Sequence, residues 1–370
     1  MPSQGGNRGS NPLGARYTIA IDGMGGDKAP DEIIRGAVKA SSLGVNILLT
    51  GDANRLEPLL KQLKRNEDVS HIHLIHAPKV VGMEDDPMSV FREKSDSSIA
   101  TAVKLLYERV ANAAISAGNS GAFYASAVRY LRFSVITRPS FAVLLPNLKG
   151  KMLLLDVGAN IDCLPFHLVD FALLGDAYMR LVEKIPEPKV ALLNIGEEPN
   201  KGNMLLKKAY QLLQNTPIHF IGNIQGRELL SGMADVVVTD GLLGNVVLKT
   251  VEGVGKSLRR VMMKQKKGGF LFGLALRLLS PSVKNVLNTL DYQEYGGGLI
   301  LGVKGVCVVA HGSATSRAIF ACIEQCKQIL DANFIPKLEE YIILNKKRRG
   351  KSVLSGDYGS WGLSPGENPE

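Results

Sequence analysis

Cysteine and aromatic residues are scarce in this chain. Four of its 370 residues are cysteine, 6% are aromatic, and there is one tryptophan. A chain of this length with 45% hydrophobic residues buries a large core without disulfides. The cysteines lie in apolar or helical contexts, which indicates reduced thiols in a cytosolic protein. They are Cys163, Cys307, Cys322 and Cys326.

Long apolar runs are missing as well. No window offers the roughly 18 apolar residues of a transmembrane helix, so we expect none. Residues 1–16 lack the apolar segment of a secretory signal, and we expect a disordered lead. Residues 345–370 are basic and then rich in Gly, Ser and Pro, which predicts a disordered tail. Residues 17–344 are predicted to form one α/β domain.

Acidic residues are outnumbered by basic ones, 35 to 44, so the net charge is +9. Such a charge favours an acidic partner, which is a nucleic acid, an anionic membrane or an acidic protein. Charge alone does not choose among these three.

Complete nucleotide and metal motifs are also absent. Gly23, Gly25 and Gly26 follow the first apolar run, but Lys28 stands where G-x-G-x-x-G needs its third glycine, and no Walker pattern occurs. In the segment HIHLIH (71–76) no cysteine or carboxylate set completes a metal site. We therefore expect neither a nicotinamide cofactor nor a metal.

What the chain does have is a recurring unit: an apolar run, a small polar loop and a helical segment. Fully apolar strands between helices predict an α/β fold with a mostly parallel sheet and helices on both faces. Because loops that follow parallel strands share one edge of the sheet, we expect these loops to form one shared crevice there. The apolar runs are residues 17–21, 113–116, 151–156, 189–195, 234–239 and 305–310.

Three of these loops are suited to bind an anion. The loop SAGNSGA (116–122) connects a predicted strand to a predicted helix. At such a helix start, the backbone N–H groups and the helix dipole favour negative charge. A tight turn without a ligand is the alternative for a single loop. Asp22 and Asp240, at strand ends, either cap local structure or orient a lysine or histidine. The candidate binding residues are Gly118, Asn119, Ser120, Gly121, Asp240, Gly241, Gly244, Asn245, His311 and Ser313.

Taken together, the loops resemble the bacterial phosphate acyltransferase family. The resemblance runs from about Tyr17 to Pro336 and rests on IDGMGGDKAPDEIIRGA, SAGNSGA, LLDVGANIDCLPFHLVDFALLG, NIGEEPNKGN, DVVVTDGLLGNVVLKTVEG and EYGGGLILGVKGVCVVAHGSATSRAI. It implies a fold related to phosphotransacetylase and isopropylmalate dehydrogenase. It also implies a reaction of acyl-acyl carrier protein with inorganic phosphate, whose acyl phosphate product feeds a glycerol-3-phosphate acyltransferase in phospholipid synthesis.

The resemblance also implies site residues. It assigns Lys201 and Asn245 to stabilisation of phosphate or of the oxyanion, and from its position at a strand end we add Asp22 to the candidate substrate-binding residues. Lys201 precedes a predicted helix, an unfavourable place for a cation unless an anion lies nearby. His311 is either a general acid or base, a phosphate contact or a structural residue. Cys163, four residues before His167, suggests a nucleophilic pair, although burial explains it equally well and phosphate attack needs no thiolate.

A basic and apolar segment, residues 259–290, is the last informative stretch. Helically spaced apolar residues beside cations suit an anionic membrane surface, a dimer interface or docking of the acidic carrier protein. The family resemblance adds a homodimer that associates peripherally with the inner face of the membrane. The residues concerned are Arg259, Arg260, Lys264, Lys266, Lys267, Leu271, Leu274 and Leu278.

The sequence thus predicts a cytoplasmic phosphate acyltransferase without cofactor and without a nucleic-acid partner. Three alternatives stay open. They are a phosphotransacetylase-like enzyme that uses acyl-coenzyme A, a dehydrogenase of related fold, and a non-enzymatic scaffold for lipid synthesis at the membrane.

Overall fold

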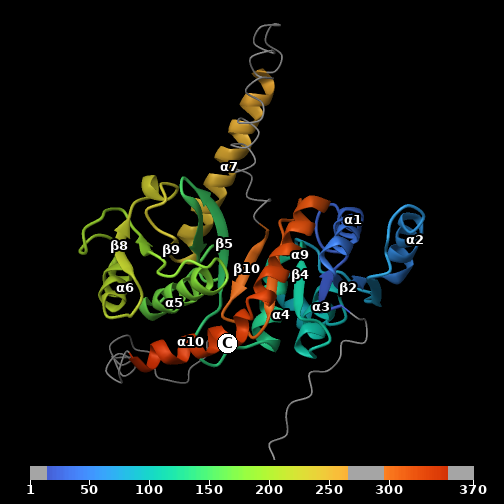
Figure 1. Cartoon of the computed structure of the whole chain (residues 1–370), viewed down its shortest axis with the longest axis horizontal. Coiled ribbons are helices and arrows are strands. Elements are labelled where there is room, and N and C mark those ends of the chain that lie inside the picture. Colours follow the sequence, from blue (N-terminus) through green and yellow to red (C-terminus); the bar gives the residue numbers. More distant parts are fainter. Residues whose placement is uncertain (1–14, 266–295, 349–370) are drawn as a thin grey trace, which may run out of the picture.

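The computed structural model describes residues 15–265 and 296–348. Its centre is one sheet of eleven strands in the order β3-β2-β1-β4-β11-β10-β5-β6-β9-β7-β8 (Figure 1). The strands are β1 (Tyr17–Asp22), β2 (Val45–Gly51), β3 (Ile72–His76), β4 (Ala113–Ser116), β5 (Ser140–Asn147), β6 (Gly150–Leu155), β7 (Val190–Leu193), β8 (Phe220–Ile224), β9 (Val236–Val238), β10 (Gly298–Leu301) and β11 (Val306–Val309).

Helices cover both faces of the sheet, as predicted. One continuous core joins the sheet to α1, α2, α5, α6, α9 and α10, while α3, α4 and α7 pack on the other face. The helices are α1 (Asp31–Lys39), α2 (Ala53–Leu63), α3 (Ser98–Tyr107), α4 (Ser120–Tyr130), α5 (Pro165–Leu181), α6 (Met204–Gln214), α7 (Gly241–Gln265), α9 (Ser316–Asp331) and α10 (Phe334–Arg348).

The prediction that these loops leave a single edge of the sheet is wrong, because the sheet reverses direction. Strands β5 and β10 do not belong to the recurring unit, and three antiparallel pairs, β11 with β10, β10 with β5 and β5 with β6, join two parallel groups. The loops after β1, β4 and β11 therefore leave one edge, and the loops after β6, β9 and β7 leave the opposite edge.

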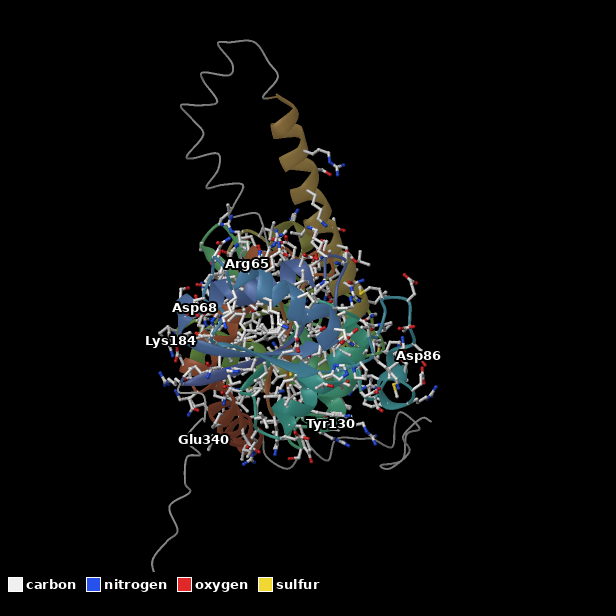
Figure 2. The ribbon with its side chains drawn as sticks, turned by 90° about the vertical axis from the view of Figure 1, so that its right-hand side faces the viewer. Arg65, Asp68, Asp86, Tyr130, Lys184 and Glu340 are labelled. Atoms are coloured by element: carbon white, nitrogen blue, oxygen red, sulfur yellow. The ribbon has the colours of Figure 1, made fainter. Side chains whose placement is uncertain are left out.

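One helix is long, and another crosses the predicted end of the domain. Helix α7 runs for 25 residues and projects from the body of the protein (Figure 1, Figure 2). Helix α10 continues to Arg348, into the stretch predicted to be a tail, because Asn345 is buried and bonds to the carbonyl of Tyr341. No helix in the described ranges is long and apolar enough to cross a membrane.

Candidate active site

A cavity of about 490 Å³ lies mainly on the sheet face that carries α4 and α7, and it reaches past the start of β10 to Leu144, Ala318 and Cys322 of the other face. The hydrophobic packing of this face is divided into one cluster with α3 and α4 and another with α7. The cavity opens between them, with Phe141, Val143, Gly298 and Val309 as its floor, named the cavity floor below. The predicted loops after β1, β4, β6, β9 and β11 all reach it, so the predicted shared crevice exists, although the loops come from both edges of the sheet.

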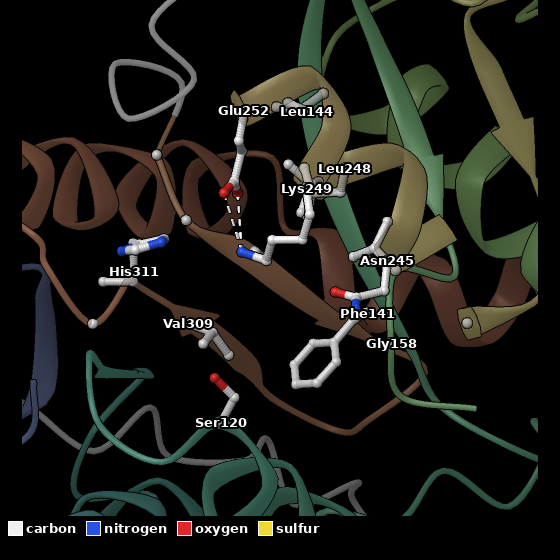
Figure 3. Close-up of a pocket in the computed structure, with 18 of the residues that line it drawn as sticks. Ser120, Phe141, Leu144, Gly158, Asn245, Leu248, Lys249, Glu252, Val309 and His311 are labelled. Atoms are coloured by element: carbon white, nitrogen blue, oxygen red, sulfur yellow. Dashed lines mark hydrogen bonds and ion pairs between the residues drawn. The ribbon is translucent and has the colours of Figure 1, made fainter. Parts of the chain in front are cut away.

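Helix α7 supplies three polar side chains to the cavity wall. Asn245, Lys249 and Glu252 lie at successive turns of the same helix face, since their spacing is four and then three residues. The Lys249 Nζ is 3.1 Å from a carboxylate oxygen of Glu252, and Glu252 is buried (Figure 3). Figure 3 shows Asn245 on the side of Gly158 and Glu252 on the side of His311. The helix thus lines the cavity between the two edges.

On the opposite wall, helix α4 contributes Ser120, its first residue. Asn119 caps this helix, accepting from Ala122 N at 3.0 Å, while its amide donates to the carbonyls of Gly82 and Asp85. The Gly118 N–H donates to Ser116 Oγ at 3.0 Å. Of the predicted donors in this loop, therefore, two are used to hold the loop itself, and Ser120 faces the cavity.

The third predicted loop brings His311 to the cavity wall. Its Nδ1 accepts the Ser313 backbone N–H at 3.1 Å, and Ser313 Oγ lies 2.9 Å from the same nitrogen. A neutral ring that accepts at Nδ1 carries its proton on Nε2. Burial lowers the pKa of His311, although the charge of Glu252 opposes this change. His311 is therefore suited to donate a hydrogen bond from Nε2.

Asp22 and Asp240 serve the local structure. Asp22 is buried and accepts from Ser116 Oγ at 2.7 Å and from the Met24 N–H, so it ties the β1 loop to β4. Asp240 accepts from the Leu243 N–H at 2.9 Å at the start of α7. The expectation that they orient a lysine or histidine finds no such contact among the described residues.

Gly241 and Gly244 let α7 begin directly against the loop that follows β6. A Cβ at residue 241 would lie 2.6 Å from the carbonyl oxygen of Asn160, and one at residue 244 would lie 1.8 Å from that of Asp156. Both distances are far below van der Waals contact. The glycines therefore set the position of the helix start, and with it the position of Asn245.

Lys201 lies outside the wall of this cavity. It is exposed, in the loop between β7 and α6, where the Asn194 amide donates to its carbonyl at 3.2 Å. This loop and the start of α7 follow the neighbouring strands β7 and β9 and leave the same edge of the sheet. Lys201 and Asn245 thus share an edge, while Asn245 alone of the two lines the cavity.

The nucleophilic Cys–His pair finds no support. Cys163 Sγ donates to the Asn160 carbonyl at 3.4 Å, and burial raises its pKa to about 12. His167 Nδ1 is occupied by the Leu164 N–H at 3.0 Å. Within residues 15–265 and 296–348, no group of three or more His, Cys, Asp or Glu side chains is placed to hold a metal ion.

The basic segment is described in part. Arg259, Arg260 and Lys264 belong to α7, and Arg260 is exposed. The other predicted contacts of this segment lie outside the described residues. They are Lys266, Lys267, Leu271, Leu274 and Leu278.

Sequence reasoning missed several wall residues. Lys249 and Glu252 carry a signal that points to them, because they repeat the helical spacing that begins at Asn245. Asp27, in the loop after β1, also lies on the wall. Phe141 and Gly298 carry no comparable signal, since they depend on strands that pair only in the tertiary structure.

Comparisons with solved structures agree with the described fold. Three solved structures share the fold at 15–16% identity. A phosphotransacetylase from Streptococcus pyogenes matches with a TM-score of 0.57 over 85% of this chain and 94% of its own. One from Staphylococcus aureus matches with 0.54 over 84% and 94%, and a branched-chain phosphotransacylase from Enterococcus faecalis with 0.52 over 84% and 98%. The predicted phosphotransacetylase architecture is confirmed.

Sequence relatives are much more similar. A phosphate acyltransferase from Desulforamulus reducens is 45% identical over 87% of this chain and 96% of its own length. One from Gloeothece citriformis is 44% identical over 88% and 94%. The model of a family described as fatty acid synthesis protein matches residues 17–337. The chain therefore belongs to the phosphate acyltransferase family and is an acyltransferase.

Proposed function

We propose that the enzyme transfers a fatty acyl group from acyl carrier protein to inorganic phosphate and so forms acyl phosphate. The observation that carries this proposal is the convergence of two helix N-termini on an apolar cavity. Ser120 begins α4, Gly241 begins α7, and both line the cavity. The positive ends of helices attract an anion, while the cavity floor suits an acyl chain.

The reaction needs no enzyme nucleophile. An oxygen of HPO₄²⁻ attacks the thioester carbonyl, the new C–O bond forms, and the C–S bond breaks. The phosphate loses one proton and the leaving thiolate gains one, so the protein supplies no net proton. Its tasks are to hold the anion beside the thioester and to stabilise the oxyanion that forms on the carbonyl.

We assign these tasks to residues at the two ends of the cavity. Asn245, together with Lys201 from the loop at the same edge, stabilises the oxyanion or the phosphate. His311 donates a hydrogen bond from Nε2 to the anion, and its tautomer is held by Ser313. Ser120 completes the set of donors, because the Gly241 and Leu243 N–H groups at the start of α7 already donate to the Asn160 carbonyl and to Asp240.

The proposed setting is cytoplasmic. The enzyme works as a homodimer at the inner face of the membrane and hands its product to a glycerol-3-phosphate acyltransferase. What supports this is the projection of α7 from the body and the cations toward its end, which suit anionic lipid headgroups. Sedimentation with vesicles that contain anionic lipid tests the membrane contact. Equal binding to neutral vesicles would argue against the role of these cations.

The reaction is tested by trapping. The purified enzyme is incubated with palmitoyl-carrier protein with and without inorganic phosphate, and acyl phosphate is captured with hydroxylamine. We expect hydroxamate that depends on phosphate. Loss of thioester at the same rate without phosphate would indicate hydrolysis and would exclude the proposed transfer.

Palmitoyl-coenzyme A at equal concentration forms the second arm of this experiment, because the solved structures of similar fold are phosphotransacetylases and a phosphotransacylase. We expect the carrier-protein thioester to give the higher kcat/KM. The reverse order would identify coenzyme A thioesters as the substrate. Binding of carrier protein and vesicles without any product would favour a scaffold.

A further inference from the structure

The run Gly296-Gly297-Gly298 borders the cavity at the start of β10. Two of these glycines are required by the backbone. Gly296 has a φ of +96°, and a Cβ there would lie 2.4 Å from Gln325 Oε1. A Cβ on Gly297 would lie 2.5 Å from the Val309 carbonyl oxygen, and the Gln325 side chain also bonds to Gly297 N–H and C=O.

Gly298 is different, because the structure around it would accept a side chain. A Cβ there would lie 3.6 Å from Val143 Cγ2 and at least 3.8 Å from backbone oxygens, which are ordinary contacts. Its φ is outside the left-handed region. A glycine within a strand is destabilising relative to alanine, because it loses more conformational freedom on folding. The backbone conformation therefore does not require a glycine at residue 298. The open space above this residue accounts for the glycine.

The strand register places that space at the centre of the cavity floor. Gly298 pairs with Val309 of β11 on one side, and the register of β10 with β5 sets it opposite Val143 on the other. The three residues line the cavity, so the floor has a side chain on each flank and none in the middle. The next row on this face, Ile300 opposite Phe141, is filled by large side chains. The result is an apolar trough that ends at Ile300 and Phe141.

We propose that Gly298 determines which acyl groups the enzyme accepts, its missing side chain making room for the distal part of a long acyl chain. This inference rests on the proposed acyl transfer and goes beyond it by naming the residue that sets chain length. A side chain at residue 298 fills the trough, so the penalty grows with the length of the acyl group. Short chains do not reach the trough and are unaffected.

The test compares wild type, Gly298→Ala and Gly298→Val on butanoyl, octanoyl, dodecanoyl and hexadecanoyl thioesters. One methylene in a tight pocket changes kcat/KM by about 10-fold or more. We expect Gly298→Val to lower kcat/KM for hexadecanoyl at least about 10-fold relative to butanoyl, with Gly298→Ala intermediate. An equal fall at all chain lengths, or no fall, would overturn the proposal. Gly226→Val is the control, because nothing lies within 4 Å of a Cβ at Gly226.

A binding arm separates this inference from the proposed function. Calorimetry with sodium dodecanoate reads occupation of the trough without turnover. We expect wild type and Gly226→Val to bind dodecanoate alike and Gly298→Val to bind it at least about 10-fold more weakly. Equal binding by all three, or no binding by wild type, would overturn the inference. A wild type that binds dodecanoate yet forms no acyl phosphate would instead overturn the proposed function.

Discussion

At the residue scale, helical spacing and tertiary position together select the polar wall of the cavity. Asn245, Lys249 and Glu252 share one face of α7, and Glu252 is buried beside its lysine partner. Asn119 and Asp22 stand in loops that looked equally suited to bind substrate. Their hydrogen bonds hold those loops together instead. Sequence identifies the loops, whereas the direction of each side chain depends on neighbours from distant segments.

Asn245→Ala tests the proposed oxyanion donor. We expect turnover to fall by about 10²-fold or more, the scale of a lost oxyanion donor, while the thermal unfolding midpoint changes little because Asn245 is exposed on the cavity wall. Hydroxamate trapping under saturating substrate measures the loss. Asn66→Ala, at an exposed position in another part of the chain, is the control. Wild-type turnover of Asn245→Ala would remove this residue from the site.

Lys201→Ala tests whether the edge loop takes part in the reaction. By the proposed role we expect a fall of about the same size, 10²-fold, with an intact fold. Lys201 lies outside the cavity wall. This variant therefore tests whether Lys201 has the role that the family resemblance implies or whether the reaction uses only residues that line the cavity. Turnover within about twofold of wild type would restrict the machinery to the cavity residues.

At the element scale, the position of α7 depends on close approach at its first turn. We expect Gly244→Ala to destabilise the protein by roughly 1–3 kcal/mol through the collision with Asp156 and to lower turnover by displacing Asn245. Urea unfolding and hydroxamate trapping measure the two effects. Gly226→Ala, with open space around it, controls for loss of a glycine. A Gly244→Ala enzyme with unchanged stability and rate would contradict this account.

The start of α5 makes stability depend on pH. Burial lowers the pKa of His167 from 6.5 to about 4, and its Nδ1 must stay unprotonated to accept the Leu164 N–H. The unfolded state therefore binds a proton first as pH falls, so stability is lost below the unfolded pKa. The loss amounts to about 3 kcal/mol at pH 4.

His167→Gln keeps an acceptor at this position without a titratable ring. We expect its urea-unfolding free energy to decline less than that of wild type between pH 6.5 and pH 4. Other groups that titrate in this range affect both proteins equally. Parallel pH profiles would mean that His167 does not contribute.

At the scale of the whole molecule, α7 presents an apolar ridge to solvent. Leu242, Val246 and Val254 lie on one i±4 row and are 59%, 54% and 62% exposed. Burial of this ridge against a second copy is the interface that we expect for the proposed homodimer. Val254→Asp should shift the sedimentation coefficient from dimer to monomer at micromolar concentration. Val110→Asp, at a valine outside α7 that is 52% exposed, should leave it unchanged.

The sequence by itself determined the local structure. The runs at 17–21 and 113–116 are strands, as it predicts, because apolar patterning and strand propensity act over a few residues. The tertiary structure decided where the loops meet. An apolar run has the same residue pattern in a parallel and in an antiparallel strand. The sequence therefore did not predict that β5 and β10 are inserted between the two parallel groups. That insertion reverses the sheet and places the site on its face, between α4 and α7, rather than at one edge.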